Sequence, residues 1–108
     1  MSYKVFSIPP FDTQLKRLAK KYPSLKNDYA NLLSALQQDP AQSVPLGKNC
    51  YKIRMKITSK KTGKSGGARV ITYVKIHFRR ITLLEIYDKA ERDNISEKEL
   101  AALLKKAE

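Results

Sequence analysis

The sequence predicts an α+β domain in which a helical hairpin and a short C-terminal helix accompany a small β-sheet. Two segments, 11–22 and 25–36, place apolar side chains at helical spacing, whereas residues 50–57 alternate between apolar and basic side chains as a half-buried strand does. A third segment, 81–87, is apolar at nearly every position, which is typical of a strand covered on both faces. At 108 residues, we expect one domain spanning 1–108.

The N-terminal part of the chain is expected to form a strand followed by two helices. The strand, residues 3–8, stops at the Pro9–Pro10 pair, because proline cannot donate a ladder hydrogen bond. The first helix ends at Tyr22, since the residue before a proline is biased away from helix. Ser24 is the expected N-cap of the second helix, which runs to the Asp39–Pro40 pair.

The rest of the chain is expected to supply three strands of one antiparallel sheet and a last helix. Pro40, Pro45 and Gly47 mark residues 40–49 as a loop, and the glycine- and lysine-rich connection 59–68 is expected to need a partner to become ordered. Ser96 and Glu99 form a capping box before the C-terminal helix. The predicted order is therefore β-α-α-β-β-β with a short C-terminal helix, over strands at 50–57, 69–75 and 81–87.

Basic residues dominate this sheet. The chain has 22 Lys and Arg against 10 Asp and Glu, and the segment 50–80 holds ten basic residues and no acidic one. Lys52, Arg54 and Lys56 share one face of their strand, about 7 Å apart, close to the spacing of phosphates along a nucleic acid. Three alternating charges alone fit a solvated edge strand, but Arg69 on the next strand and the acid-free segment favour a polyanion as partner.

Several classes of function lack support in the sequence. Cys50 is the single cysteine, so no internal disulfide, metal cluster or cofactor site is expected. Residues 63–65 imitate the end of a phosphate-binding loop, but the required earlier glycine is Thr58 and a strand follows. His77 is more simply read as an exposed histidine at a turn than as a catalytic group. No signal peptide or membrane span is recognisable, and we expect a cytoplasmic protein.

These features resemble the toxins of bacterial type II toxin–antitoxin systems, in the RelE/ParE superfamily with its HigB-like members. The resemblance is carried by the segment 50–54, the glycine-rich loop, the segment 67–73, and a last apolar strand ending in Tyr87-Asp88-Lys89. It implies a RelE-like fold, with the helical hairpin packed on one face of a curved antiparallel sheet and the active groove on the other.

The resemblance also implies an activity, namely metal-independent cleavage of messenger RNA on the ribosome. The ribose 2′-hydroxyl attacks the adjacent phosphate, so the reaction needs orientation, proton transfer and cations that stabilise the phosphorane. By position, Lys52 and Arg54 would orient RNA or move protons, Arg69 would stabilise the transition state, and Lys89 falls where relatives have a catalytic basic residue. Nearby cations favour a neutral amine, which makes Lys52 a possible general base.

The proton donor is the open position in this pattern. The catalytic tyrosine of RelE would fall near Ile95, so its role is absent or has moved to Tyr87. Acid/base substitutes used by other relatives point here to Asp88, Glu91 or a repositioned His77. The further basic residues expected to bind RNA are Lys56, Lys60, Lys61 and Lys64.

Three functions remain in competition on the sequence alone. The leading one is a ribosome-dependent mRNA endoribonuclease that inhibits translation; the second is a ParE-like poison of DNA gyrase; the third is a nucleic-acid-binding protein or a catalytically decayed toxin. Both toxin interpretations imply an acidic antitoxin that folds on binding to the basic chain, and the nuclease adds the ribosome and mRNA as partners.

Overall fold

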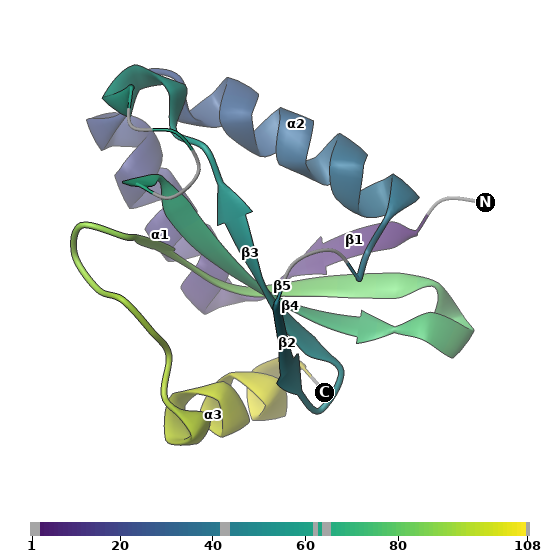
Figure 1. The fold of residues 1–108 in the computed structure, drawn as a ribbon. Helices are drawn as coiled ribbons and strands as arrows, with labels where there is room; N and C mark the ends of the chain where they lie inside the picture. Colours follow the sequence, from purple (N-terminus) through teal and green to yellow (C-terminus); the bar gives the residue numbers. More distant parts are fainter. Residues whose placement is uncertain (1–2, 42–43, 62, 64–65, 108) are drawn as a thin grey trace.

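The computed structural model describes residues 3–41, 44–61, 63 and 66–107. Its elements follow the expected order, with one additional strand (Figure 1). The strands and helices are β1 (Lys4–Ser7), α1 (Pro9–Lys21), α2 (Leu25–Gln38), β2 (Val44–Gly47), β3 (Cys50–Met55), β4 (Ala68–Lys75), β5 (Arg80–Asp88) and α3 (Glu97–Ala107). Short 3₁₀ turns at Thr58–Lys60 and Ile76–Phe78 follow β3 and β4.

The strands form one mixed sheet in the order β1-β5-β4-β3-β2. The antiparallel pairing expected for the strands at 50–57, 69–75 and 81–87 is confirmed for β3, β4 and β5, whereas β1 pairs in parallel with β5. The chain between β1 and β5, which contains α1, α2 and strands β2 to β4, is long enough for the crossover that a parallel pairing requires. The prediction of a loop over 40–49 is also wrong in part, because β2 lies there as a short edge strand paired with the start of β3.

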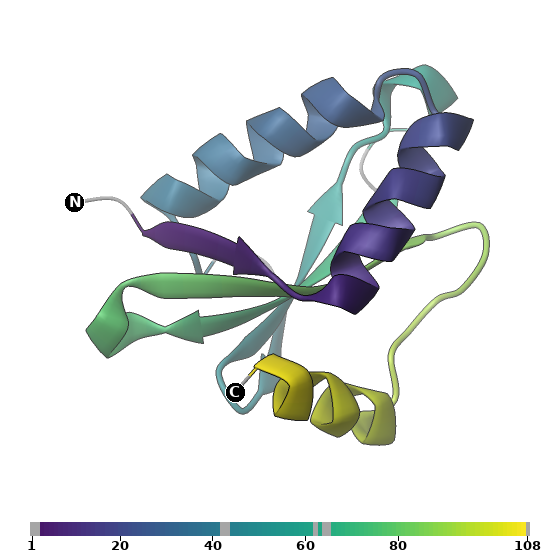
Figure 2. The ribbon, with the colours of Figure 1, turned by 180° about the vertical axis from the view of Figure 1, so that it is seen from behind.

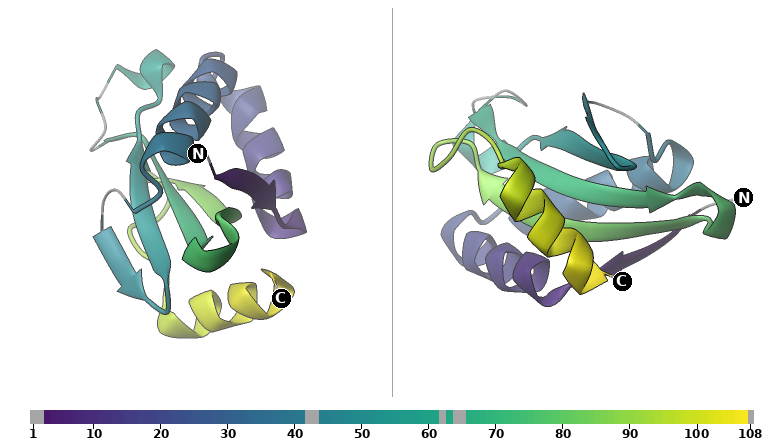
Figure 3. Two further views of the ribbon diagram at one scale, coloured as in Figure 1. Left: turned by 90° about the vertical axis from the view of Figure 1, so that its right-hand side faces the viewer. Right: turned by 90° about the horizontal axis from the view of Figure 1, so that it is seen from below.

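Helices α1 and α2 lie over one face of the sheet and α3 over the other, as Figures 2 and 3 show from behind, from the side and from below, and apolar side chains form a cluster on each face. On one face, α1 and α2 cover the larger cluster, in which Phe11 and Leu18 of α1 are buried with Ile53 and Met55 of β3. On the other face, α3 covers a smaller cluster. That cluster contains Ile8, Cys50, Ile71, Leu84, Tyr87, Leu100 and Leu103. The face expected to be cationic is therefore partly a second core.

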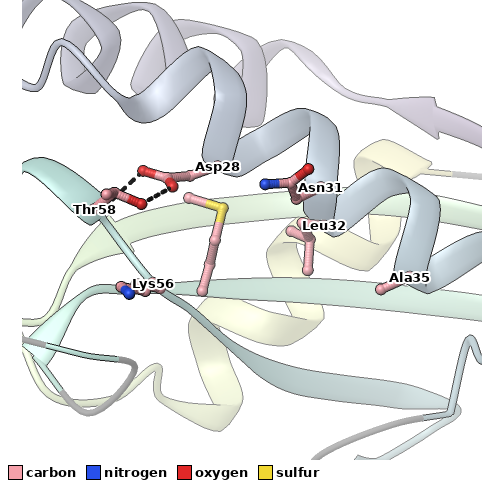
Figure 4. A pocket seen from close by; sticks show the side chains of 7 residues that line it. Asp28, Asn31, Leu32, Ala35, Lys56 and Thr58 are labelled. Atoms are coloured by element: carbon pink, nitrogen blue, oxygen red, sulfur yellow. Dashed lines mark hydrogen bonds between the residues drawn. The ribbon is translucent and has the colours of Figure 1, made fainter.

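Helix α2 is joined to the turn after β3 by one buried carboxylate. Asp28 accepts hydrogen bonds from the Thr58 backbone N–H at 2.9 Å and from its hydroxyl at 2.6 Å, beside a hollow of about 350 Å³ between α2 and β3 (Figure 4). Burial raises the pKa of Asp28, but the bonds from Thr58 and Ser24 outweigh it and leave the pKa lowered. The predicted N-cap Ser24 occupies its position without a capping bond, since its hydroxyl bonds to Asp28 at 2.8 Å.

The capping box before α3 is confirmed. The Glu99 backbone N–H donates to the Ser96 hydroxyl at 3.1 Å, and the Ser96 N–H donates to the Glu99 carboxylate at 3.3 Å. This reciprocal pair fixes the point at which the connection after β5 becomes helix. Within the described residues, no helix is both long and apolar enough to cross a membrane.

Candidate active site

Three of the predicted site residues form one row across the sheet. Arg54 of β3 pairs in register with Arg69 of β4, and Arg69 pairs with Tyr87 of β5. Side chains at paired positions of an antiparallel sheet share a face and have Cβ atoms about 5 Å apart. Lys52, two residues before Arg54, extends the same face by about 7 Å along β3. The sheet therefore brings a lysine, two arginines and a tyrosine together.

Arg69 is the buried cation of this row. Only 4% of its surface is exposed, and one guanidinium nitrogen donates to the Ala68 carbonyl at 3.1 Å. Burial lowers the pKa of Arg69, and the neighbouring charge of Arg54 lowers it further, because each disfavours the charged form. An arginine remains charged under these conditions, so a phosphate placed here would relieve an unfavourable charge environment.

Tyr87 is buried beside the connection between β5 and α3. Its hydroxyl donates to the Asp93 carbonyl at 3.3 Å, and the Arg92 guanidinium lies 4.8 Å from the centre of its ring. Burial raises the pKa of Tyr87, partly offset by Arg92 and Arg69. The phenol therefore keeps its proton at neutral pH, as a proton donor must.

Residues 93 and 94 lie over the cationic row, and the sequence did not reveal them. Lys89 forms an ion pair with the Asp93 carboxylate, and the Lys52 ammonium donates to the Asn94 side-chain oxygen at 3.1 Å. The hydrogen bond from Lys89 lowers the pKa of Asp93 most, and the charges of Arg69 and Lys52 add to it. The connection, which descends from β5 to α3 in Figure 1, thus places a carboxylate among four predicted site residues.

The remaining predicted site residues lie outside the cationic row. Lys60 bonds to the buried Asp88 at 2.7 Å, and Glu91 pairs with Arg17 of α1 at 2.9 Å. Lys56 is exposed and lines the hollow between α2 and β3, and Lys61 is exposed after the 3₁₀ turn. Lys64 lies outside the described residues.

His77 and Cys50 lie away from the row. His77 is exposed in the turn between β4 and β5, at the other end of the sheet. Cys50 is buried against α3, and burial raises the pKa of its thiol to about 11, so it is a packed apolar side chain. In the part of the chain that the structure describes, no three His, Cys, Asp or Glu side chains are grouped as metal ligands.

Comparison with known proteins identifies the family. The model of the family described as the RelE toxin of the RelE / RelB toxin–antitoxin system matches residues 11–108. This chain belongs to the RelE toxin family. The predicted resemblance is confirmed, and the chain is the toxin of a toxin–antitoxin system, a class whose partner is an antitoxin. No curated protein matches the sequence.

A solved structure supports the same fold. The free state of an Escherichia coli RelE toxin, a double arginine-to-alanine mutant, superposes with a TM-score of 0.62 at 14% sequence identity. The match covers 99% of this chain and 95% of that RelE chain. The predicted α+β class is confirmed, and RelE-family membership supports a coarse assignment as a nuclease toxin.

Proposed function

We propose that this RelE-family toxin is a cytoplasmic, ribosome-dependent endoribonuclease that cleaves messenger RNA and arrests translation. The observation that carries the proposal is the cross-strand row of Arg54, Arg69 and Tyr87, extended by Lys52 on β3 and Lys89 after β5. Residues of these types supply the positive charge and the proton-transfer groups that cleavage of a ribose phosphate chain needs.

The reaction forms one bond and breaks one. The 2′-oxygen bonds to the adjacent phosphorus, the bond from phosphorus to the 5′-oxygen breaks, and the products carry a 2′,3′-cyclic phosphate and a 5′-hydroxyl. A base takes the 2′ proton and an acid protonates the leaving 5′-oxygen. Arg54 and Arg69 are the residues that would stabilise the additional charge on the phosphorane, since they are cross-strand neighbours and the charge of Arg54 acts on Arg69.

Lys52, Lys89 and Tyr87 are the candidates for proton transfer. Lys52 would act as the base, while the buried phenol of Tyr87 or Lys89 would supply the proton. Asp93 and Asn94 hold all three side chains in place. Asp93 pairs with Lys89 and accepts the Tyr87 hydroxyl at its carbonyl, and Asn94 accepts from Lys52. We infer that the RNA phosphate takes the position of the Asp93 carboxylate when the substrate binds.

The antitoxin is expected to be acidic, because the chain carries a formal net charge of +12. An acidic segment of the antitoxin laid over Arg54 and Lys52 would exclude RNA from the same charges. Binding of the antitoxin should therefore weaken as the salt concentration rises.

A cell-based experiment separates this function from poisoning of gyrase. The toxin is induced in parallel with its Arg54→Ala variant, and incorporation of labelled methionine and thymidine is followed. The proposal predicts rapid loss of methionine incorporation with wild type only. Loss of thymidine incorporation together with a DNA-damage response would contradict it and favour gyrase as the target.

A further inference from the structure

The turn between β4 and β5 carries the most exposed large apolar side chains of the described residues. Phe78 is 76% exposed and Ile76 is 62% exposed. The turn lies at the end of the sheet away from the connection between β5 and α3 (Figures 1 and 2). Lys75 lies six positions after Arg69 along β4, which corresponds to about 20 Å. The cleavage mechanism gives this turn no role.

A hollow of about 280 Å³ adjoins the turn. Its lining residues include Tyr73, Lys75 and Phe78, together with Asn49 from the turn before β3. The Lys75 ammonium lies 5.5 Å from the centre of the Tyr73 ring. Among the described residues, the Asn49 side-chain amide has no hydrogen-bond partner. The volume is at the lower end for small-molecule sites, so one planar ring system would fill it.

Backbone hydrogen bonds hold the walls of this hollow in place. The Arg79 N–H donates to the Ile76 carbonyl at 3.1 Å, and the Lys4 N–H donates to the Arg79 carbonyl at 3.0 Å. On the opposite side, the Val74 N–H donates to the Asn49 carbonyl at 2.9 Å. A ligand would therefore meet a preformed surface and would not have to order a loop.

The charges around the hollow are all positive. Lys75 ends β4, Arg79 lies in the turn and Arg80 begins β5, and residues 40–84 contain no Asp or Glu. Every ion pair found in the described ranges lies elsewhere, while Arg80 stacks on the Phe6 ring at 4.0 Å. Cations of this kind beside exposed aromatic rings are the pattern by which proteins hold single-stranded nucleic acid.

We propose that this hollow binds one unstacked base of single-stranded RNA. The base stacks on Phe78, the Asn49 amide bonds to its edge as donor and acceptor, and Lys75 and Arg79 contact the flanking phosphates. The assignment takes from the proposed function only that RNA is the partner. A purely apolar protein segment would use Phe78 and Ile76 but would leave the amide and the cations unpaired.

The chain contains no tryptophan, which provides a direct reporter. The Phe78→Trp variant is prepared in an Arg54→Ala background and titrated with a ten-nucleotide single-stranded RNA. The proposal predicts quenching of the tryptophan fluorescence by stacking. An abasic chain of the same length should bind without quenching. Quenching is measured separately with free RNA and with ribosomes that lack mRNA. The two measurements show whether the bound base comes from the substrate or from ribosomal RNA, and quenching in either one supports the site.

Affinity measurements on two truncations complete the test. Phe78→Ala and Phe78→Leu should each weaken binding of the ten-nucleotide RNA about fivefold or more, because both remove the flat ring. Wild-type affinity in Phe78→Leu, or quenching by an acidic peptide but not by RNA, would overturn the proposal in favour of a protein partner. Absence of ribosome-dependent cleavage would contradict the proposed function alone, whereas cleavage without quenching would overturn this site alone.

Discussion

Arg54 and Arg69 are cross-strand neighbours with the same charge, so they repel each other when no RNA is bound. Arg69 is nearly fully buried, and burial together with Arg54 lowers its pKa. The charge of Asp93 offsets part of this effect, and the greater negative charge of a phosphorane would offset more of it, which is how such a site can stabilise the transition state more than the substrate.

Arg54→Ala should therefore separate activity from stability. We expect the rate of mRNA cleavage to fall about 100-fold or more, since a charge-stabilising group is lost. The midpoint of urea unfolding should stay the same or rise, because the exposed Arg54 repels the buried Arg69. Cleavage assays and urea titrations check this, with exposed Lys26→Ala on α2 as the control. Unchanged cleavage with reduced stability would show that Arg54 is structural.

Asp93→Asn tests whether the carboxylate over the row competes with RNA. The change removes the negative charge that pairs with Lys89 and lies near Arg69 and Lys52. We expect KM for mRNA-programmed ribosomes to fall several-fold with kcat unchanged, measured by steady-state cleavage. Glu97→Gln on α3 makes the same change in net charge at an exposed position and is the control. A large drop in kcat would instead place Asp93 in proton transfer.

At the scale of elements, the start of β4 depends on a residue without a side chain. Gly67 packs so closely on the end of β3 that an added Cβ would lie 2.1 Å from the Met55 carbonyl oxygen. Its own carbonyl accepts the Lys89 N–H at 3.0 Å. The close approach therefore aligns β3, β4 and the end of β5, the three strands that carry the row.

Gly67→Ala should destabilise the fold by about 1–3 kcal/mol, as overpacking does, and should reduce cleavage further than the stability loss explains. The added Cβ would force β3 away from β4, which would move Arg54 relative to Arg69. Urea unfolding and cleavage at a temperature where the variant is folded measure the two effects. In Gly63→Ala the added Cβ meets nothing within 4 Å; its φ of +71° makes alanine strained in that loop, but no strand has to shift, so cleavage should be retained. Equal cleavage in the two variants would contradict this account.

Sequence patterns predicted the elements whose periodicity is strong and missed those without it. Alternation over β3 correctly placed Lys52 and Arg54 on one face, and the paired strands brought Arg69 and Tyr87 beside them. Strand β2 was missed because four residues with a proline and a glycine show no alternation.

The position of Asp93 could not be predicted for a related reason. The segment between β5 and α3 has no period, and its path is set by tertiary contacts. Arg92 donates to the Asn94 carbonyl at 3.0 Å and to the Glu99 carboxylate at 2.9 Å, and it stacks on Tyr87. Mixed charge in the segment was visible in the sequence, but the partners of those charges lie on other elements.

At the scale of the whole molecule, Asp88 joins the helical layer to the sheet. It is fully buried and bonds to Tyr22 at the end of α1 and to Lys60 in the turn after β3. Burial raises its pKa, but the bonds from Lys60 and Tyr22 outweigh burial and lower it overall. Because Asp88 lies between Tyr87 and Lys89 in sequence, the same bonds hold two site residues in place.

Asp88→Asn should cost about 3 kcal/mol of stability, because it leaves the charge of Lys60 without its buried partner. A lowered carboxyl pKa stabilises the fold above the unfolded value of about 3.9, and that stability is lost as the pH falls through the folded value. The difference between wild type and variant should thus be constant from about pH 5 to pH 8 and shrink below about pH 4.

Urea unfolding followed by circular dichroism across this pH range measures the effect. Asp12→Asn is the control for the loss of one exposed carboxylate; Asp12 lies on α1 and accepts a hydrogen bond from Ser7. A difference that stays constant down to about pH 3 would mean that the Asp88 charge contributes nothing.

The most direct test of the central claim is primer extension on mRNA bound to programmed ribosomes, with the same RNA free in solution alongside. Purified wild type and Arg54→Ala are compared under both conditions. The account predicts cuts within the A-site codon, with ribosomes and wild-type protein only. No cuts from folded wild-type protein in either sample, or equal cutting by Arg54→Ala, would contradict the claim that the cationic row is a ribosome-dependent nuclease site.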